Sequence, residues 1–228
     1  MNPDPHKTGP RLVFVHGWGF EPGVWQSLRA ELSDLDTTTI DLGFFGAPVG
    51  PASPPDRPLV VVGHSLGVLW LLMTRPFAWS GLISINGFPR FIEGPGYKPA
   101  VPRRQLDRMI RRLPADPAGV CEEFRYRCGC AGPLPDGPVP DSLLHGLQWL
   151  RDWDARRSPG TTTPEPPILA LSGGADPILP VGMDEHCFDS FSDVRSARLE
   201  EAGHLLPVTD PVWCAGKMRT FLAEVAPC

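Results

Sequence analysis

The stretch from Leu59 to Thr74 reads LVVVGHSLGVLWLLMT, and it predicts a strand, a tight turn and a helix in immediate succession. Leu59–Val62 is a continuous apolar run rich in valine, which is typical of a strand buried on both faces of a parallel sheet. Leu66–Thr74 is apolar almost all round, so we expect a buried helix. Between them Gly63-His64-Ser65-Leu66-Gly67 places Ser65 at a sharp turn, where its hydroxyl could act as a nucleophile. A plain turn of small residues is the alternative.

Five further apolar runs bounded by turn residues predict the remaining strands: Leu12–Val15, Thr37–Leu42, Leu82–Ile85, Ile168–Leu171 and, most weakly, Ser196–Leu199. Helical spacing of apolar residues over Val24–Leu32, and an Asp-Pro start before Val212–Val225, predict helices between and after them. Strands that alternate with helices predict an α/β fold with a mainly parallel sheet of about six strands.

Residues 88–160 interrupt this alternation, because they contain helical patterns and no convincing strand. Helices are expected at Pro102–Leu113, Pro117–Arg127 and Asp141–Trp153, separated by proline-rich joints. The sequence therefore predicts a core formed by residues 1–87 and 161–228, with residues 88–160 as a helical insert on top of the sheet.

Composition excludes several classes of protein. The chain has 228 residues and a formal net charge of −5, which disfavours non-specific binding of nucleic acid. It has no apolar run long enough to span a membrane and no apolar segment near its start, so we expect a cytoplasmic protein.

Cys121, Cys128 and Cys130, with His145 downstream, fit no common zinc spacing, so we expect free thiols and no metal site. We also expect a monomer.

A serine nucleophile needs a base and an acid, and in this type of fold they follow the serine in the order acid, histidine. His204 lies after the last predicted strand and is the candidate base; His16 and His64 are the alternatives. Asp176 follows the strand Ile168–Leu171 and is the candidate acid. Asp184 and Asp154 are weaker alternatives to it, and a turn-forming Asp-Pro pair is the non-catalytic interpretation.

Two backbone N–H groups are then needed to stabilise an oxyanion, one of them from the residue after the nucleophile, here Leu66. Trp18 is the second candidate, because it lies in the Gly-rich loop His16-Gly17-Trp18-Gly19 after the first strand. Trp18 could also line a substrate pocket or simply pack in the core. This chemistry requires no metal and no organic cofactor.

In combination these motifs resemble the α/β-hydrolase superfamily: HGWG at 16–19, GHSLG at 63–67, GGADPILP at 173–180 and AGHLLP at 202–207. The resemblance implies a serine hydrolase with Ser65, Asp176 and His204 as its catalytic triad. It does not imply a substrate, because one fold hosts many chemistries. A generalist esterase, thioesterase or C–C hydrolase, and a non-catalytic protein that binds a small ligand, therefore remain as alternatives.

A narrower resemblance is to the pimeloyl-[acyl-carrier protein] methyl ester esterases of biotin synthesis. It is carried by His16–Phe20 with Val24-Trp25, by GPGYKP at 94–99, and by Gly146-Leu147 with Leu150. It implies a carboxylesterase whose helical insert covers the serine. It further implies substrate contacts by Trp18 and by Phe124, Arg125, Tyr126, Arg127 and Cys128, with Phe124 as the best candidate for contact with the acyl chain. Phe124 could equally be a core residue of the insert.

This resemblance also implies an acidic carrier protein that docks on arginines of the insert. Residues 88–160 hold 12 Lys or Arg and 9 Asp or Glu, although the whole chain is acidic. Five arginines crowd one predicted helix: Arg103, Arg104, Arg108, Arg111 and Arg112. An acidic partner or an anionic substrate could be steered to them, and a solvated helix face is the simpler interpretation.

The sequence also departs from the superfamily pattern. The first strand begins near residue 11, which leaves no room for the antiparallel hairpin that usually opens the fold. Only 24 positions separate Asp41 from Ser65, so the helix usually found there is expected to be lost or reduced to Gly46–Arg57. All the predicted catalytic residues are retained, so we expect ester hydrolysis through an acyl-enzyme.

Overall fold

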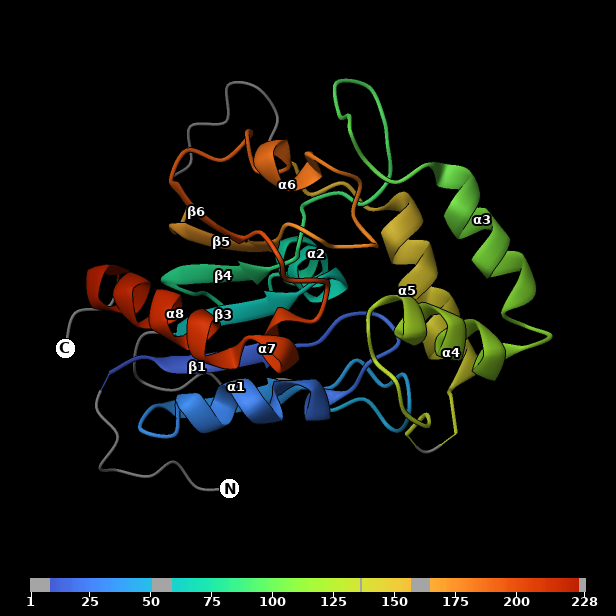
Figure 1. Ribbon diagram of the computed structural model, residues 1–228, viewed down its shortest axis with the longest axis horizontal. Coiled ribbons are helices and arrows are strands. Elements are labelled where there is room, and N and C mark those ends of the chain that lie inside the picture. Colours follow the sequence, from blue (N-terminus) through green and yellow to red (C-terminus); the bar gives the residue numbers. More distant parts are fainter. Residues whose placement is uncertain (1–8, 51–58, 136, 157–164, 226–228) are drawn as a thin grey trace.

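The protein is seen here as a computed structural model, which describes residues 9–50, 59–135, 137–156 and 165–225 (Figure 1). Its centre is a six-stranded sheet in the order β2-β1-β3-β4-β5-β6, in which every neighbouring pair is parallel. The strands are β1 (Arg11–Val15), β2 (Asp36–Ile40), β3 (Leu59–His64), β4 (Gly81–Ile85), β5 (Ile168–Gly173) and β6 (Val194–Leu199). The predicted parallel α/β sheet is confirmed, and the described residues add no antiparallel strand to it.

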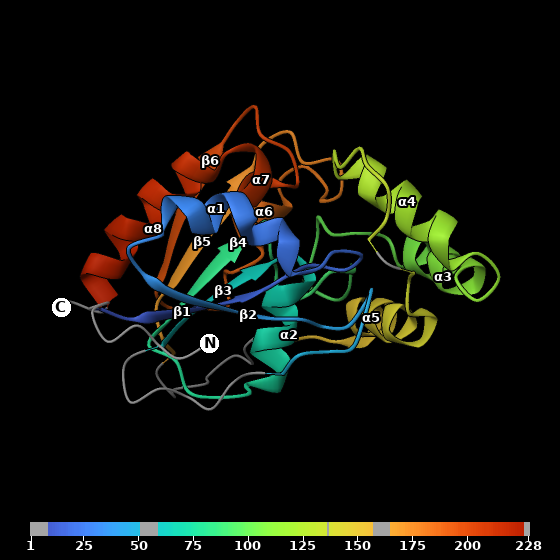
Figure 2. The same ribbon diagram turned by 90° about the horizontal axis from the view of Figure 1, so that it is seen from below.

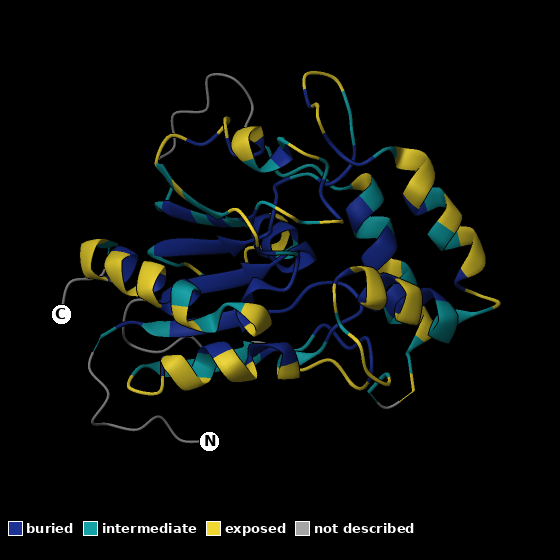
Figure 3. Cartoon of the chain, in the orientation of Figure 1, coloured by how far each residue is buried: buried dark blue, intermediate teal, exposed yellow. Residues whose placement is uncertain are grey.

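Helices cover both faces of the sheet (Figure 2). A 3₁₀ turn η1 (Pro22–Trp25), α1 (Gln26–Glu31), α7 (Leu206–Thr209) and α8 (Pro211–Val225) lie on one face, and α1 contacts α8. The helix α2 (Leu66–Thr74) lies on the other face and contacts β1 and β3. The central strands are buried because both faces are covered, which explains their continuous apolar sequences (Figure 3).

Three helices lie beyond the carboxyl ends of the strands: α3 (Arg103–Arg112), α4 (Pro117–Arg127) and α5 (Pro140–Asp152). Each predicted helix of residues 88–160 is therefore present within two residues of its expected ends. The helix α5 contacts α2 and α3, and α3 also contacts α4. Much of α3 and α4 is exposed, whereas the side of α5 that meets the core is buried (Figure 3). We call residues 88–160 the helical insert.

Some features of the fold do not follow from the sequence pattern. The four-residue helices α6 (Met183–His186) and α7 were not predicted, because one helical turn is too short to show a periodicity. The reduced helix considered for Gly46–Arg57 is not seen in residues 46–50, and its remaining residues lie outside the described ranges. In the described part of the chain no helix is long and apolar enough to cross a membrane.

Candidate active site

Ser65 occupies the turn between β3 and α2 in a strained backbone conformation. Its φ of 51° and ψ of −120° lie in a region that non-glycine residues rarely adopt and that costs about 1–3 kcal/mol. Two backbone hydrogen bonds hold the turn, from Ser65 N–H to the Ile85 carbonyl at 3.0 Å and from Val68 N–H to the Ser65 carbonyl at 3.1 Å. The serine is thereby fixed at the carboxyl end of the sheet, beneath the helical insert.

The glycines that flank the serine are required by close packing. A Cβ atom on Gly63 would lie 2.6 Å from the backbone nitrogen of Val68, and one on Gly67 would lie 2.2 Å from the carbonyl oxygen of Val15. Both distances are shorter than any tolerable contact, so the approach of α2 to the strands depends on glycine at both positions.

His204 and Asp176 meet at the same end of the sheet. The Nδ1 atom of His204 lies 2.7 Å from Oδ2 of Asp176, and both side chains are buried. The second carboxylate oxygen of Asp176 accepts hydrogen bonds from the backbone N–H groups of Ile178 and Leu179, at 2.7 and 3.2 Å. Burial alone would raise the pKa of Asp176, but His204 and these hydrogen bonds bring it below its usual value. Asp176 is therefore ionised at neutral pH.

The other ring nitrogen of His204 is unpaired. Its Nε2 atom is buried and has no hydrogen-bond partner among the described residues. Burial of an unpaired polar nitrogen is costly, and such atoms often mark a functional position. A histidine with Nδ1 bound to a carboxylate and Nε2 unpaired has the arrangement needed to accept a proton from a neighbouring hydroxyl.

Two buried residues, Asn86 and His64, hold these loops in place, a role that the sequence does not predict for either. Asn86, at the end of β4, donates from Nδ2 to the Gly203 carbonyl at 2.9 Å and accepts the Gly173 N–H at 2.8 Å. His64 Nε2 lies 2.8 Å from the carbonyl oxygen of His204 and donates to it. Burial, followed by the proximity of His204, lowers the pKa of His64 to about 3, so it stays neutral. These three contacts join residues 117, 87 and 140 positions apart, so no local sequence signal indicates them.

The loop after β1 lies against the serine turn. A Cβ atom on Gly17 would stand only 3.1 Å from the Cβ of Ser65. The backbone N–H of Trp18 forms no hydrogen bond with the described residues, and that of Leu66 opens α2, where no preceding turn can accept it. The indole of Trp18 donates to the Leu143 carbonyl at 2.8 Å and packs edge-on against Phe124, with ring centroids 5.0 Å apart. Trp18 thus joins the serine end of the core to the helical insert.

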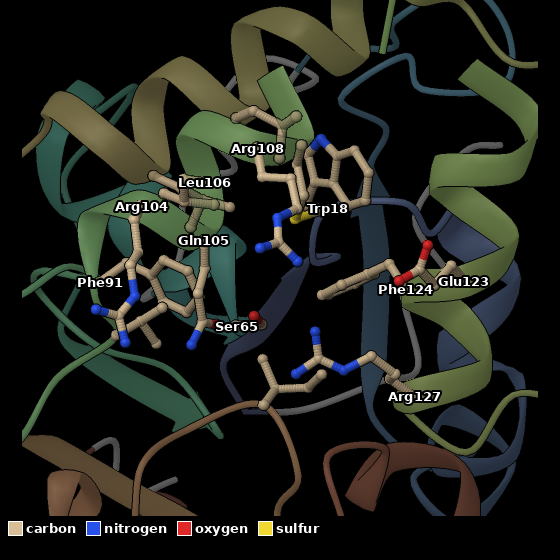
Figure 4. A pocket seen from close by; sticks show the side chains of 15 residues that line it. Trp18, Ser65, Phe91, Arg104, Gln105, Leu106, Arg108, Glu123, Phe124 and Arg127 are labelled. Atoms are coloured by element: carbon tan, nitrogen blue, oxygen red, sulfur yellow. The ribbon is translucent and has the colours of Figure 1, made fainter. Parts of the chain in front are cut away.

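A cavity of about 370 Å³ opens above Ser65 between the core and the helical insert (Figure 4). Apolar and polar side chains both line it, and three of the polar ones are arginines. The lining residues are Trp18, Ser65, Phe91, Val101, Arg104, Gln105, Leu106, Arg108, Met109, Glu123, Phe124, Arg127, Leu147, Leu150 and Ile178. The nucleophile candidate therefore faces a space in which an acyl chain could lie.

Only some of the residues from Phe124 to Cys128, which were expected to contact the substrate, line the cavity, because they lie on different faces of α4. Phe124 and Arg127 line the cavity, whereas Arg125, Tyr126 and Cys128 do not. Consecutive helical residues point about 100° apart, so only positions three or four apart share one face. Tyr126 is 76% exposed, Cys128 is buried, and Arg125 is buried against the loop after β1. The cavity lining therefore supports Phe124 and Arg127 alone from this stretch.

The alternative histidines and acids have other partners. His16 accepts the Leu42 N–H at 3.0 Å and lies 3.1 Å from Asp41. Asp184 accepts hydrogen bonds from Ser172 and Arg198, and Asp154 is paired with Arg90 and Arg156. No group of three or more His, Cys, Asp or Glu in the described ranges could hold a metal ion.

Comparison with known proteins identifies the family. A pimeloyl-[acyl-carrier protein] methyl ester esterase from Stenotrophomonas maltophilia is 33% identical over 208 residues, which cover 75% of this chain and 76% of that protein. The chain belongs to this esterase family. A second member, from Methylococcus capsulatus, is 29% identical over an alignment that covers 95% of the chain and 96% of that protein. No protein-family model matches the chain.

Solved structures agree on the fold of this esterase family member. An esterase from Exiguobacterium antarcticum superposes with a TM-score of 0.78 at 18% identity and covers 95% of this chain and 92% of its own. MenH from S. aureus superposes with a TM-score of 0.69 at 16% identity. These structures show that the chain has the α/β-hydrolase fold, and its relatives in the family are esterases.

Proposed function

We propose that the protein hydrolyses a carboxylic ester through an acyl-enzyme. In the first step Ser65 Oγ bonds to the ester carbonyl carbon and its proton passes to His204 Nε2. The tetrahedral intermediate collapses with cleavage of the carbon–oxygen bond, and His204 returns the proton to the leaving alcohol. Water then attacks the acyl-enzyme by the same route and releases the carboxylic acid and free Ser65. The unpaired, buried Nε2 of His204 is the observation that carries this assignment.

Asp176 and two backbone N–H groups supply the electrostatic part of this mechanism. Asp176 holds the His204 ring with its proton on Nδ1 and stabilises the imidazolium that forms. The N–H groups of Trp18 and Leu66 stabilise the oxyanion, each worth roughly 2.7–4 kcal/mol of transition-state energy. The Trp18 N–H, which forms no hydrogen bond with the described residues, and the closeness of Gly17 to Ser65 support this role.

The proposed substrate is the methyl ester of pimeloyl-[acyl-carrier protein], which the relatives are named for. The apolar side chains that line part of the cavity suit a methylene chain, with Phe124 as the acyl contact from α4. The arginine-rich face of α3 would meet an acidic carrier protein by charge attraction. A role in biotin synthesis follows if this substrate is correct.

The first experiment is hydrolysis of p-nitrophenyl esters of increasing acyl length, with Ser65→Ala as the matched variant. We expect kcat/KM to fall by roughly 10³-fold or more in Ser65→Ala, because no other group replaces the nucleophile. A fluorophosphonate should label the wild-type protein at Ser65 and leave the variant unlabelled.

Hydrolysis of pimeloyl-[acyl-carrier protein] methyl ester, compared with a free short-chain methyl ester, then tests the substrate. A strong preference for the carrier-bound ester supports the proposal, and equal rates would favour a generalist esterase. Absence of both labelling and hydrolysis would overturn the catalytic mechanism and favour a protein that only binds a small ligand.

A further inference from the structure

The charges around the cavity are unbalanced. Arg104 and Arg108 reach it from α3 and Arg127 from α4, and Figure 4 shows their guanidinium groups around the opening in which Ser65 is seen. Glu123 is the one acidic side chain among the lining residues. The cavity above Ser65 therefore has an excess of positive charge, although the whole chain is acidic.

The charge of Glu123 is already paired with an arginine that does not line the cavity. The Glu123 carboxylate accepts a hydrogen bond from Arg112 Nη1 at 2.5 Å, and the same guanidinium also binds Asp116 at 2.9 Å. Arg103 likewise lies near two carboxylates, those of Asp107 and Asp152, at 3.9 and 3.6 Å. Two of the five arginines of α3, neither of which lines the cavity, thus have acidic partners.

The arginines that line the cavity lack such partners. Arg104 and Arg108 form no ion pair or hydrogen bond with any residue that the structure describes, and the one partner of Arg127 there is the Pro177 carbonyl at 3.3 Å. Arg104 and Arg108 are four residues apart and share one helix face, where two like charges repel each other and destabilise the helix. An anion bound between them would relieve this repulsion.

Apolar side chains lie in the same cavity as the nucleophile and these cations. They include Phe91, Val101, Leu106, Met109, Leu147 and Ile178. The cavity thus combines a serine that can attack an ester carbonyl, an apolar wall that suits methylene groups, and arginines that suit an anion. A molecule with an ester at one end, an apolar middle and a negative charge at the other end matches all three features.

We propose that, among small esters that are not bound to a carrier, the cavity selects those whose acyl chain ends in an anionic group, a carboxylate or a phosphate, which Arg104, Arg108 and Arg127 bind. This inference rests on the proposed esterase function and adds a substrate class to it. The anion subsite is part of the cavity itself, so it acts on small substrates with no carrier protein present.

The test compares monomethyl and dimethyl esters of straight-chain dicarboxylic acids of increasing length, assayed with the full chain at low ionic strength. At the preferred length we expect kcat/KM per ester group to be roughly tenfold higher for the monoester, because its free carboxylate reaches the arginines. In the Arg104→Gln/Arg108→Gln double variant this ratio should fall to about one. Salt at 1 M should lower the wild-type ratio, because it screens exposed charges.

Two controls separate the subsite from general electrostatics and from the esterase function. Lys217→Gln removes one positive charge from α8, away from the cavity, and should leave the monoester-to-diester ratio unchanged. A methyl ester that ends in a phosphate instead of a carboxylate distinguishes the two anions, and faster hydrolysis of either one supports the subsite. Equal rates per ester group for charged and neutral substrates, or a ratio that survives in the double variant, would overturn it. Failure to hydrolyse any of the esters would instead overturn the proposed function.

Discussion

Asn86 shows how much of the candidate site depends on a residue that touches neither the nucleophile nor the base. Its backbone has a positive φ of 45°, a conformation that asparagine tolerates better than most residues. Its side-chain amide donates to the carbonyl of Gly203, beside His204, and accepts the N–H of Gly173, the last residue of β5, which leads to Asp176. The distance between acid and base is therefore set in part from β4.

Replacement of Asn86 by alanine should lower kcat by roughly ten- to a hundredfold with little change in KM, because small displacements of catalytic groups are costly. Asn86→Asp is the informative companion, since a carboxylate can still accept from Gly173 but cannot donate to Gly203. We expect kcat of the aspartate variant to be impaired as well. Steady-state kinetics on a short p-nitrophenyl ester, with the melting temperature measured in parallel, would check this. A lower melting temperature with unchanged kcat in both variants would show that Asn86 contributes to stability and does not position the catalytic residues.

Site residues that belong to a short sequence motif can be predicted from the sequence. Site residues that act through hydrogen bonds to distant positions cannot. Ser65 and its flanking glycines stand in one five-residue motif, and Asp176 and His204 each follow a predicted strand. The two partners of Asn86 lie 117 and 87 positions away and that of His64 lies 140 positions away, so only the folded chain brings them together. None of these pairings can be inferred from spacing or composition.

Among the elements, α4 links the helical insert to the loop that carries Trp18. Arg125 Nη1 donates to the Gly19 carbonyl at 3.0 Å, and the guanidinium lies 5.0 Å from the centre of the Phe20 ring. The preceding residue, Phe124, packs edge-on against Trp18. Arg125 is buried without an acidic partner among the described residues, so its charge is offset by the carbonyl, the Cys130 sulfur at 3.3 Å and aromatic rings.

We expect Arg125→Met to lower kcat about tenfold or more, because loss of a charge-assisted hydrogen bond of about 1.5–3 kcal/mol frees the loop of the proposed oxyanion donor. Arg125→Lys keeps the charge and one donor and should recover part of the loss. The measurement is kcat on a short ester together with the affinity for an alkyl boronic acid, which mimics the tetrahedral intermediate. If boronate affinity stays at the wild-type value while kcat falls, Arg125 does not act through this loop.

The ends of helices and strands could be predicted where nearby residues determine them. The helices α2 and α4 begin and end at the predicted residues, because α2 is bounded by the serine turn and α4 by Asp116-Pro117. The strands are recovered within two residues because both faces of the sheet are covered and the apolar runs are continuous. The one-turn helices α6 and α7 leave no periodic pattern and could not be predicted.

At the scale of the whole molecule, the two ends of the helical insert are tied together where they leave the core. Asp154 near its end is ion-paired with Arg90 near its start, and Arg156 lies 2.8 Å from the same carboxylate. The backbone N–H of Ala155 donates to the Pro89 carbonyl at 2.8 Å, next to this pair. Both connections between insert and core therefore run through one cluster of charges, which fixes the insert above Ser65.

The charge of Asp154 makes this attachment sensitive to acid. Burial would raise the pKa of Asp154, but hydrogen bonds from Arg156 and Arg90 lower it to about 2. The folded-state pKa is below the ordinary value of 3.8, so the carboxylate stabilises the fold fully above about pH 4. That contribution is lost as the pH falls from about 4 to 2, because the folded protein must then take up the proton.

Asp154→Asn should therefore lower the free energy of unfolding at pH 7 by about 1 kcal/mol, a value reduced by the partial exposure of the pair to solvent. The difference between wild type and variant should shrink as the pH falls toward 2, because the wild-type carboxylate becomes neutral as well. Urea unfolding at pH 7, 5 and 3 measures this difference. Glu201→Gln, which changes an exposed carboxylate without an ion pair among the described residues, is the control and should give a small difference at every pH. A difference for Asp154→Asn that stays constant from pH 7 to 3 would show that packing, and not charge, holds the two ends of the insert together.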